Sequence, residues 1–479
     1  MTRRVHRIRV VVALAVLAVL TSACTRSVAG QPVRVGSGGG TQSQDSPPET
    51  ANGLKKDAPK PDLEADGTEE GNKYDTLAVD TIDDLYSYYR EVFPRDFDKD
   101  FTPAKKLISY DSNATSDSAC GIKLAKRVNA SYVGSCDSIV WDRGVLMPMM
   151  EKEVGELSAP TILAHEMGHL VQARLGAART STLLFEQQAD CYAGAYWRWV
   201  ADGHSKYFDF SSGDGTRQMF TAMMWVGDPA GLLADNGDAH GNGFDRSFAA
   251  AIGFANGPKR CNEITQKEVD ERGQQTGFGQ IPKNFGNIEV TDKLINQVVV
   301  TLDSYFGQTV PGYQKPKLEP YTGDSPPACQ GTTPKPPVDY CPASKSVRYN
   351  LAQLQKIGTP AASWRANNGD FSAIILVASR YALAAQATGG GSVTGDQAGL
   401  RGLCYTGTWA HWLGNPQGPD KLKLSPNDLN KAVYEVVSSP LAAGDVNARS
   451  GTAVLDQVQA LHIGVIYDIR RCFDFYGQQ

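Results

Sequence analysis

Apolar residues recur with helical periodicity in several long segments of this chain. The segments 77–93 and 290–306 carry apolar side chains every three or four residues, which predicts two amphipathic helices. The segment 159–175 is apolar over most of its length. It predicts a partly buried helix that Ser158 caps and Gly176 ends. Another long helix is expected over 181–201, and more helices between 215 and 257.

Short strands are predicted between these helices, around 106–110 and 138–141. The fold class is therefore α+β with helices dominant. Residues 25–72 are rich in Gly, Ser, Pro, Asp and Glu and nearly free of large apolar residues. Such a segment cannot bury enough surface to fold, so we expect a disordered tether over 24–72 and a folded body that begins near residue 73.

The N-terminus has the features of an export signal. Four arginines precede the apolar run 10–20, which is too short to span a bilayer stably. The run ends in LTSAC, which resembles a bacterial lipobox and predicts removal of residues 1–23 and lipidation of Cys24. A plain secretory signal is the alternative. No later stretch is expected to be long and apolar enough to cross a membrane, so the expected location is the extracytoplasmic face of the cell membrane, held by the lipid.

The net charge of the chain argues against nucleic acid as a partner. The 479 residues carry a net charge of −5, and removal of the signal leaves 43 basic against 52 acidic residues. A protein with this acidic balance is a poor binder of nucleic acid.

The body contains an internal duplication. CYAG at 191–194 recurs as CYTG at 404–407, and the spacing to a later Arg-Cys pair at 260–261 and at 471–472 is nearly the same. We therefore expect one unit over 73–285 and a second copy over 286–479.

The repeat also predicts how the cysteines pair. Besides Cys24 there are eight, four in each copy and in the same order, and an even number in an exported chain indicates disulfides. The predicted bridges are Cys120–Cys136, Cys191–Cys261, Cys329–Cys341 and Cys404–Cys472.

The strongest chemical signal lies in the apolar segment 159–175. His165-Glu166-Met167-Gly168-His169 is an H-E-x-x-H motif in a chain with only seven histidines. On a helix, residues four apart share one face, so both imidazoles can hold one metal ion. Glu166 is then placed to take a proton from a water on that metal. The alternative is a surface helix with two unrelated histidines.

Two histidines leave a metal short of protein ligands. The metzincin pattern is excluded because Gln172 and Leu175 stand where it needs Gly and His. Glu186 and Asp190 are four apart on the next predicted helix. We expect Glu186 to be the third ligand and Asp190 to accept the free ring N–H of a ligand histidine. An exposed acidic pair is the alternative.

The combination HEMGHLVQ, EQQADCYAG, a later His-Gly and a cysteine resembles the bacterial neutral zinc metallopeptidase family over residues 75–265. The tethered, duplicated form resembles lipoprotein peptidases of actinobacteria. The resemblance implies a zincin-like fold, a Zn²⁺ cofactor, peptide or protein substrates and Glu186 as the third ligand. His240 aligns with the family's His-Gly and is the first candidate for stabilising the oxyanion. Tyr192 and Arg246 are weaker candidates.

The second copy has lost the motif. Ser379 and Leu383 replace the two histidines, Arg380 replaces Glu166, and Gly399 replaces Glu186. We expect a pseudo-peptidase that shapes a cleft or binds a partner. The leading hypothesis is thus a lipid-anchored zinc peptidase with Glu166 as general base. The alternatives are a non-catalytic zinc-binding or scaffold lipoprotein, and an enzyme that its own second unit or tether inhibits.

Overall fold

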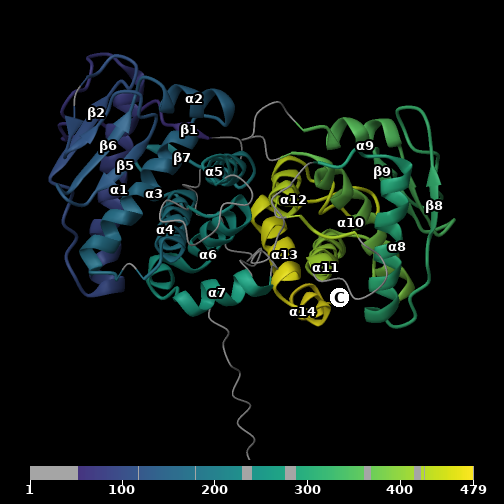
Figure 1. The fold of residues 1–479 in the computed structure, drawn as a ribbon. Helices are drawn as coiled ribbons and strands as arrows, with labels where there is room; N and C mark the ends of the chain where they lie inside the picture. The colour runs from purple at the N-terminus through teal and green to yellow at the C-terminus, as the bar shows by residue number, and fades with distance from the viewer. Residues whose placement is uncertain are drawn as a thin grey trace, which may run out of the picture.

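The structure is a computed structural model that describes residues 52–116, 118–178, 180–228, 240–275, 287–360, 368–414, 422–425 and 427–477. The expected export signal and the expected lipidation site at Cys24 lie outside these residues. Figure 1 shows two units side by side, the first in purple and blue and the second in green and yellow. The described chain is helix-dominated with small sheets, as the sequence predicts for an α+β fold.

The first unit packs helices against a three-stranded sheet. The sheet has the order β2-β6-β5, with β2 parallel and β5 antiparallel to the central strand β6. Its main elements are α1 (Lys73–Phe97), β2 (Lys106–Tyr110), β5 (Ala130–Val133), β6 (Ser138–Asp142), α2 (Leu146–Glu153), α3 (Ser158–Leu175), α4 (Thr182–Ala201), α5 (Asp214–Trp225), α6 (Gly243–Asn262) and α7 (Gln266–Gln275). Two-residue strands form two further small pairs: β3 (Ser118–Ala119) with β4 (Ile122–Lys123), and β1 (Gly53–Leu54) with β7 (Phe208–Asp209).

The second unit repeats this order of elements. Its sheet β8-β10-β9 again has one parallel and one antiparallel neighbour of the central strand. Its elements are α8 (Asp292–Thr309), β8 (Lys317–Pro320), β9 (Val338–Cys341), β10 (Ser346–Tyr349), α9 (Leu351–Gly358), α10 (Asp370–Thr388), α11 (Asp396–Gly414), α12 (Asp428–Ser438), α13 (Val454–Ile466) and α14 (Ile469–Tyr476). The kink of α6 at Gly257 corresponds to the break between α13 and α14.

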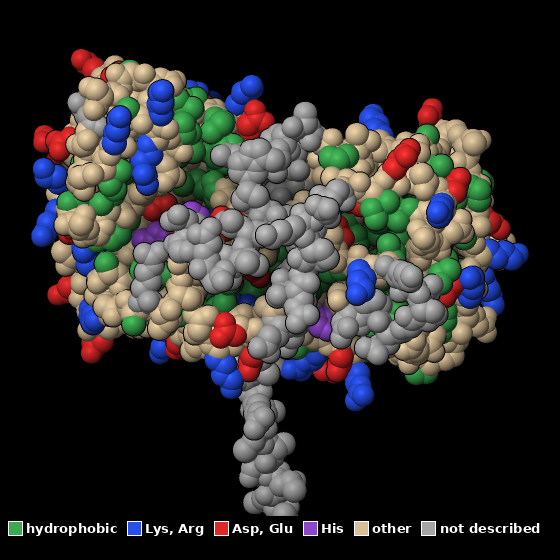
Figure 2. Space-filling model, in the orientation of Figure 1, with side chains coloured by type: hydrophobic (Ala, Val, Ile, Leu, Met, Phe, Trp, Pro, Cys, Tyr) green, Lys and Arg blue, Asp and Glu red, His purple; other side chains and the backbone are tan. Residues whose placement is uncertain are grey.

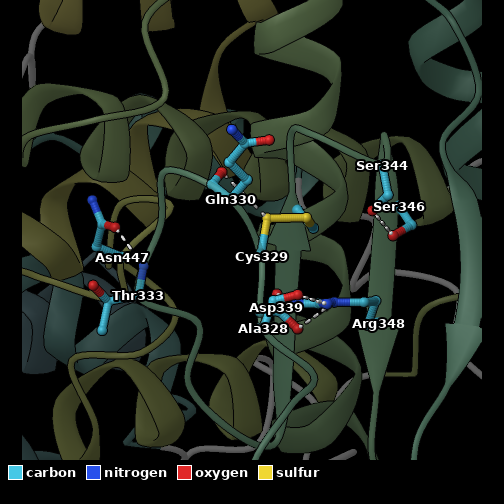
Figure 3. Close-up of a disulfide and its surroundings, with 10 residues drawn as sticks. Ala328, Cys329, Gln330, Thr333, Asp339, Ser344, Ser346, Arg348 and Asn447 are labelled. Carbon is cyan, nitrogen blue, oxygen red and sulfur yellow. Dashed lines mark hydrogen bonds and ion pairs between the residues drawn. A yellow bond between two sulfur atoms is a disulfide. The ribbon is translucent and has the colours of Figure 1, made fainter.

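Disulfides and close helix packing also recur. All four predicted bridges are present. Figure 3 shows Cys329 in its bridge, beside the buried ion pair of Asp339 with Arg348 that joins β9 to β10. In each unit a glycine of the central helix lies against the backbone of a later helix. A Cβ on Gly194 would lie 2.0 Å from Ala250 O, and one on Gly407 would lie 2.5 Å from Leu461 O. The duplication is therefore a repeat of packing as well as of sequence.

The two units meet through equivalent helices. α5 and α6 of the first unit contact α12 and α13 of the second. Most buried apolar residues of both units belong to one continuous core, and a small separate cluster lies under the sheet of the first unit. The interface is consequently a pseudo-symmetric one, in which the same pair of helices comes from each copy.

Three expectations need correction. Residues 52–72 are not a free tether, because β1 pairs with β7, and Asp66 forms a β-bridge with Ile108 of β2. Ser158 is the first residue of α3 and not its cap, which is Leu157 without a side-chain hydrogen bond. One later stretch, α10, is long and apolar enough to cross a membrane, but 89% of it is buried inside the protein. It is the counterpart of α3 and has the composition of a core helix.

Candidate metal centre

Two adjacent helices bring the expected metal ligands together. α3 supplies His165 and His169, and α4 supplies Glu186. One ligand atom from each lies within 4.8 Å of the others. Nε2 of His165 is 3.1 Å from Glu186 Oε2, and Nε2 of His169 is 3.4 Å from Glu186 Oε1. Both rings thus turn the same nitrogen toward one carboxylate, as a shared cation would require.

The donor set fits a divalent metal ion. Glu186 Oε2 is buried and accepts no hydrogen bond from the described residues, although a buried carboxylate oxygen normally has a donor. Two imidazoles and one carboxylate are a ligand set of catalytic zinc sites, with a fourth position left for water. A cation between the three side chains would satisfy the unpaired oxygen.

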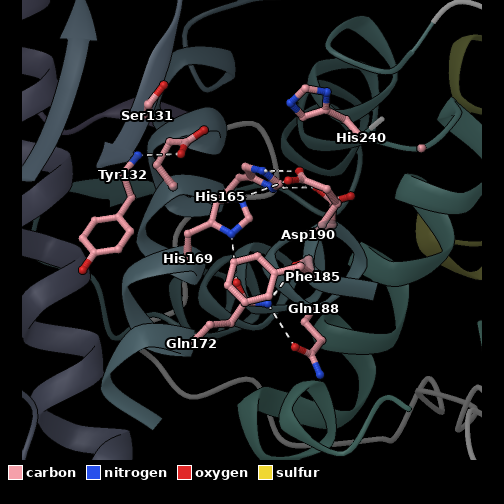
Figure 4. Close-up of polar contacts among 12 residues, drawn as sticks. Ser131, Tyr132, His165, His169, Gln172, Phe185, Gln188, Asp190 and His240 are labelled. Carbon is pink, nitrogen blue, oxygen red and sulfur yellow. Dashed lines mark hydrogen bonds and ion pairs between the residues drawn. The ribbon is translucent and has the colours of Figure 1, made fainter. Parts of the chain in front are cut away.

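The other nitrogen of each ring is also held. His165 Nδ1 is 2.8 Å from Asp190 Oδ1, which also accepts from Arg246 at 2.7 Å. His169 Nδ1 is 2.9 Å from Gln172 Oε1, and Phe185 stacks on the same ring. Figure 4 shows Asp190 pointing toward His165, and Phe185 and Gln172 beside His169. Such outer partners fix the tautomer and the orientation of ligand histidines.

Of these outer residues, the sequence predicted Asp190 but missed Gln172 and gave Arg246 a different role. Gln172 lies three residues after His169, a spacing at which helical side chains meet. That spacing could have identified it. Arg246 comes from α6, and no local pattern relates it to α3.

Neighbouring side chains of the site shift the pKa values of His165 and Glu186. Desolvation alone would lower the pKa of His165, but the carboxylates of Asp190 and Glu186 raise it to about 10. Burial would raise the pKa of the Glu186 carboxyl, but the close approach of the two histidines outweighs burial and lowers this pKa well below its ordinary value. Because metal ligands must give up their protons, zinc should bind more weakly as the pH falls.

Glu166 is anchored to the sheet. The backbone N–H of Tyr132, in the edge strand β5, donates to Glu166 Oε2 at 2.8 Å. Glu166 is only 9% exposed. The hydrogen bond fixes the carboxylate of the H-E-x-x-H glutamate against β5.

Gly168 allows α3 and α4 to approach closely enough for the site to form. A Cβ at this position would lie 2.8 Å from Ala189 Cα and 2.9 Å from Ala189 O. These are backbone atoms, which cannot rotate out of the way as a side chain can. We expect Gly168→Ala to push apart the helices that carry the histidines and Glu186. The predicted loss is roughly 1–3 kcal/mol of stability, together with weaker zinc binding. Thermal unfolding and zinc titration would measure both.

Gly213→Ala is the matched control for that substitution, because a Cβ on Gly213 meets nothing within 4 Å. Equal zinc affinity of the Gly168→Ala and Gly213→Ala proteins would contradict the steric argument.

The candidates for oxyanion stabilisation do not lie together. His240 is apart from the ligand group in Figure 4, and its ring is 3.5 Å from Asp228. The hydrogen bond with Asp228 raises the pKa of His240. Tyr192 is fully buried and has no hydrogen-bond partner among the described residues, which does not fit a donor in an open site. Arg246 donates to Asp190 at 2.7 Å and lies 3.4 Å from Nδ1 of His165, on the side of that ring away from Glu186.

Within the described residues of the second unit, no three side chains come together as His165, His169 and Glu186 do in the first. Arg380, which replaces Glu166, donates to the backbone oxygens of Leu441, Gly444 and Asp445. A buried cation with three carbonyl acceptors thus stands at the position that corresponds to Glu166 in the first unit.

On the face shown in Figure 2, histidine and acidic side chains lie close together in the first unit, next to hydrophobic side chains. No family model, curated protein or solved structure matches the chain.

Proposed function

We propose that this protein is a zinc-dependent peptidase. The observation that carries the proposal is the buried group His165, His169 and Glu186, with Glu166 one residue away from the first ligand. A purely structural zinc site needs no carboxylate beside its ligands that is itself held in place. The hydrogen bond from β5 to Glu166 therefore favours a hydrolase over a non-catalytic scaffold.

Each residue of the site would have a separate role in hydrolysis. His165, His169 and Glu186 would hold the ion, which supplies a Lewis acid and lowers the pKa of a water ligand to about 7. Glu166 would take the proton as the water attacks the peptide carbonyl and give it to the leaving amine. Asp190 and Gln172 keep the imidazoles oriented during the reaction. His240 stays a candidate for a donor to the substrate oxygen.

The edge strand β5 supports a peptide as substrate. Its outer side is not paired with another strand in the described residues, and it lies against Glu166. An extended peptide can add to such an edge through backbone hydrogen bonds, which brings its carbonyl groups toward the carboxylate. The arginine-rich apolar N-terminus and the lipobox-like LTSAC sequence support an activity at the outer face of the cell membrane.

Zinc dependence tests the proposal most directly. The purified chain should contain about one zinc ion, cleave members of a peptide library, lose cleavage with a chelator and regain it when zinc is restored. Metal analysis and mass spectrometry of the peptides would measure these effects. A chain that holds zinc but cleaves no peptide would support the scaffold alternative.

A further inference from the structure

One helix of the first unit links the metal centre to the degenerate copy. α6 packs against α4, which carries Glu186 and Asp190, and also against α12 and α13 of the second unit. Arg246 lies in the first turn of α6 and reaches Asp190. Any group that fixes this turn therefore acts on the orientation of His165 through Arg246 and Asp190.

The second unit supplies a cap to that turn. The first N–H groups of a helix have no partner within the helix. Asn242 accepts one hydrogen bond, from Asp245 N. The N–H of Phe244 donates at 2.8 Å to Oδ1 of Asn430, a residue of α12 that is 2% exposed. A side chain from the degenerate copy thus satisfies a backbone donor of the catalytic unit.

Asn430 is itself held rigidly. Its side-chain amide donates to Asn427 at 3.0 Å. The next residue, Lys431, is buried and forms ion pairs with Asp370 on α10 and with Asp428. α10 is mostly buried inside the second unit, so these contacts fix Asn430 to the core of that unit.

A second contact acts on the same turn of α6. His462 of α13 lies between the rings of Phe244 and Phe248, with centroids 4.4 and 5.0 Å away. Its Nε2 is 3.3 Å from Ser247 Oγ. Burial lowers the pKa of His462 to about 3, so the ring stays neutral and packs as an aromatic group.

We propose that Asn430 and His462, in the copy that has lost its own metal ligands, are positioning residues of the metal centre in the first unit. They hold the first turn of α6, and that turn holds Arg246 against Asp190. The inference rests on the proposed metal site. It gives the degenerate unit a role that needs neither a partner protein nor a ligand of its own.

The test compares two capping asparagines in the full chain. Asn430→Ala removes the cap of α6, whereas Asn350→Ala removes an equally buried cap of α9 within the second unit. We expect zinc affinity, measured by chelator competition, to fall about fivefold in Asn430→Ala and to stay unchanged in Asn350→Ala. Amide exchange in the first turn of α6 should rise only in Asn430→Ala.

Two further variants keep the test decisive. Asn430→Asp retains the acceptor and should restore zinc affinity. If Asn430→Ala does not fold, Ser247→Ala can replace it in the test. This substitution removes the contact between Ser247 and His462 and should also weaken zinc binding. Equal zinc affinity of the Asn430→Ala and Asn350→Ala proteins, or of the Ser247→Ala protein and wild type, would overturn the inference. Because these readouts are metal affinity and exchange, absence of peptide cleavage would refute the proposed activity without touching this result.

Discussion

Glu166→Gln should lower peptide hydrolysis by about 10²- to 10⁴-fold, the contribution of a general base, while zinc content stays near that of wild type. Glutamine has nearly the shape of glutamate but cannot take the proton from the attacking water. It keeps a carbonyl oxygen that can accept the hydrogen bond from the backbone N–H of Tyr132. The variant therefore separates proton transfer from the packing of α3 against β5, which Glu166→Ala would also disturb.

The measurement is the ratio kcat/KM for one peptide, with zinc determined in the same preparation. Glu156→Gln is the matched control, since the Glu156 carboxylate also accepts a hydrogen bond from a strand residue, Leu54, but lies outside the metal site. Its activity should equal that of wild type. Hydrolysis by Glu166→Gln at the wild-type rate would remove Glu166 from the mechanism.

Removing Glu186 should have a different signature. Glu186→Ala takes away one of three expected ligands, and we expect zinc affinity to fall by more than the roughly 10- to 100-fold that loss of an outer-shell partner costs. Activity would be lost with the metal. Asp190→Asn changes such an outer partner, because Asp190 contacts His165 and not the centre of the ligand group. The expected order of zinc affinity is thus wild type, then Asp190→Asn, then Glu186→Ala.

Chelator competition would establish that order, and Gln187→Ala provides its control. Gln187 is buried beside Glu186 on α4, but its side chain accepts from Arg272 on α7, away from the histidines. Zinc affinity in Gln187→Ala should match wild type. Undiminished zinc binding by Glu186→Ala would show that the third ligand is a different residue.

Local sequence patterns were sufficient for the long helices of the first unit, for two of its strands and for much of the ligand group. The spacing of His165 and His169, and that of Glu186 and Asp190, each follow from one helix, where residues four apart share a face. Strand β2 begins and ends where the sequence predicts a strand, at residues 106 and 110. The repeat predicted all four disulfides because corresponding cysteines keep their order and spacing.

Local sequence patterns failed where a structural feature depends on contacts between residues that are far apart in the chain. Residues 52–72 have the composition of a tether, yet β1 finds a partner in β7, more than 150 residues away. The role of Arg246 depends on α6 lying against α4, and no pattern within α6 indicates that neighbour.

The sequence by itself determined the motif, the repeat and the loss of ligands in the second copy, because these depend on residue identity and short spacing. Only the tertiary structure decided that Glu186 meets both histidines, which depends on the close approach of two helices at Gly168. It also decided that Asn430, far along the chain and in the degenerate copy, caps the helix that carries Arg246. Such contacts arise from how separate surfaces pack, and the chain around each residue does not encode them locally.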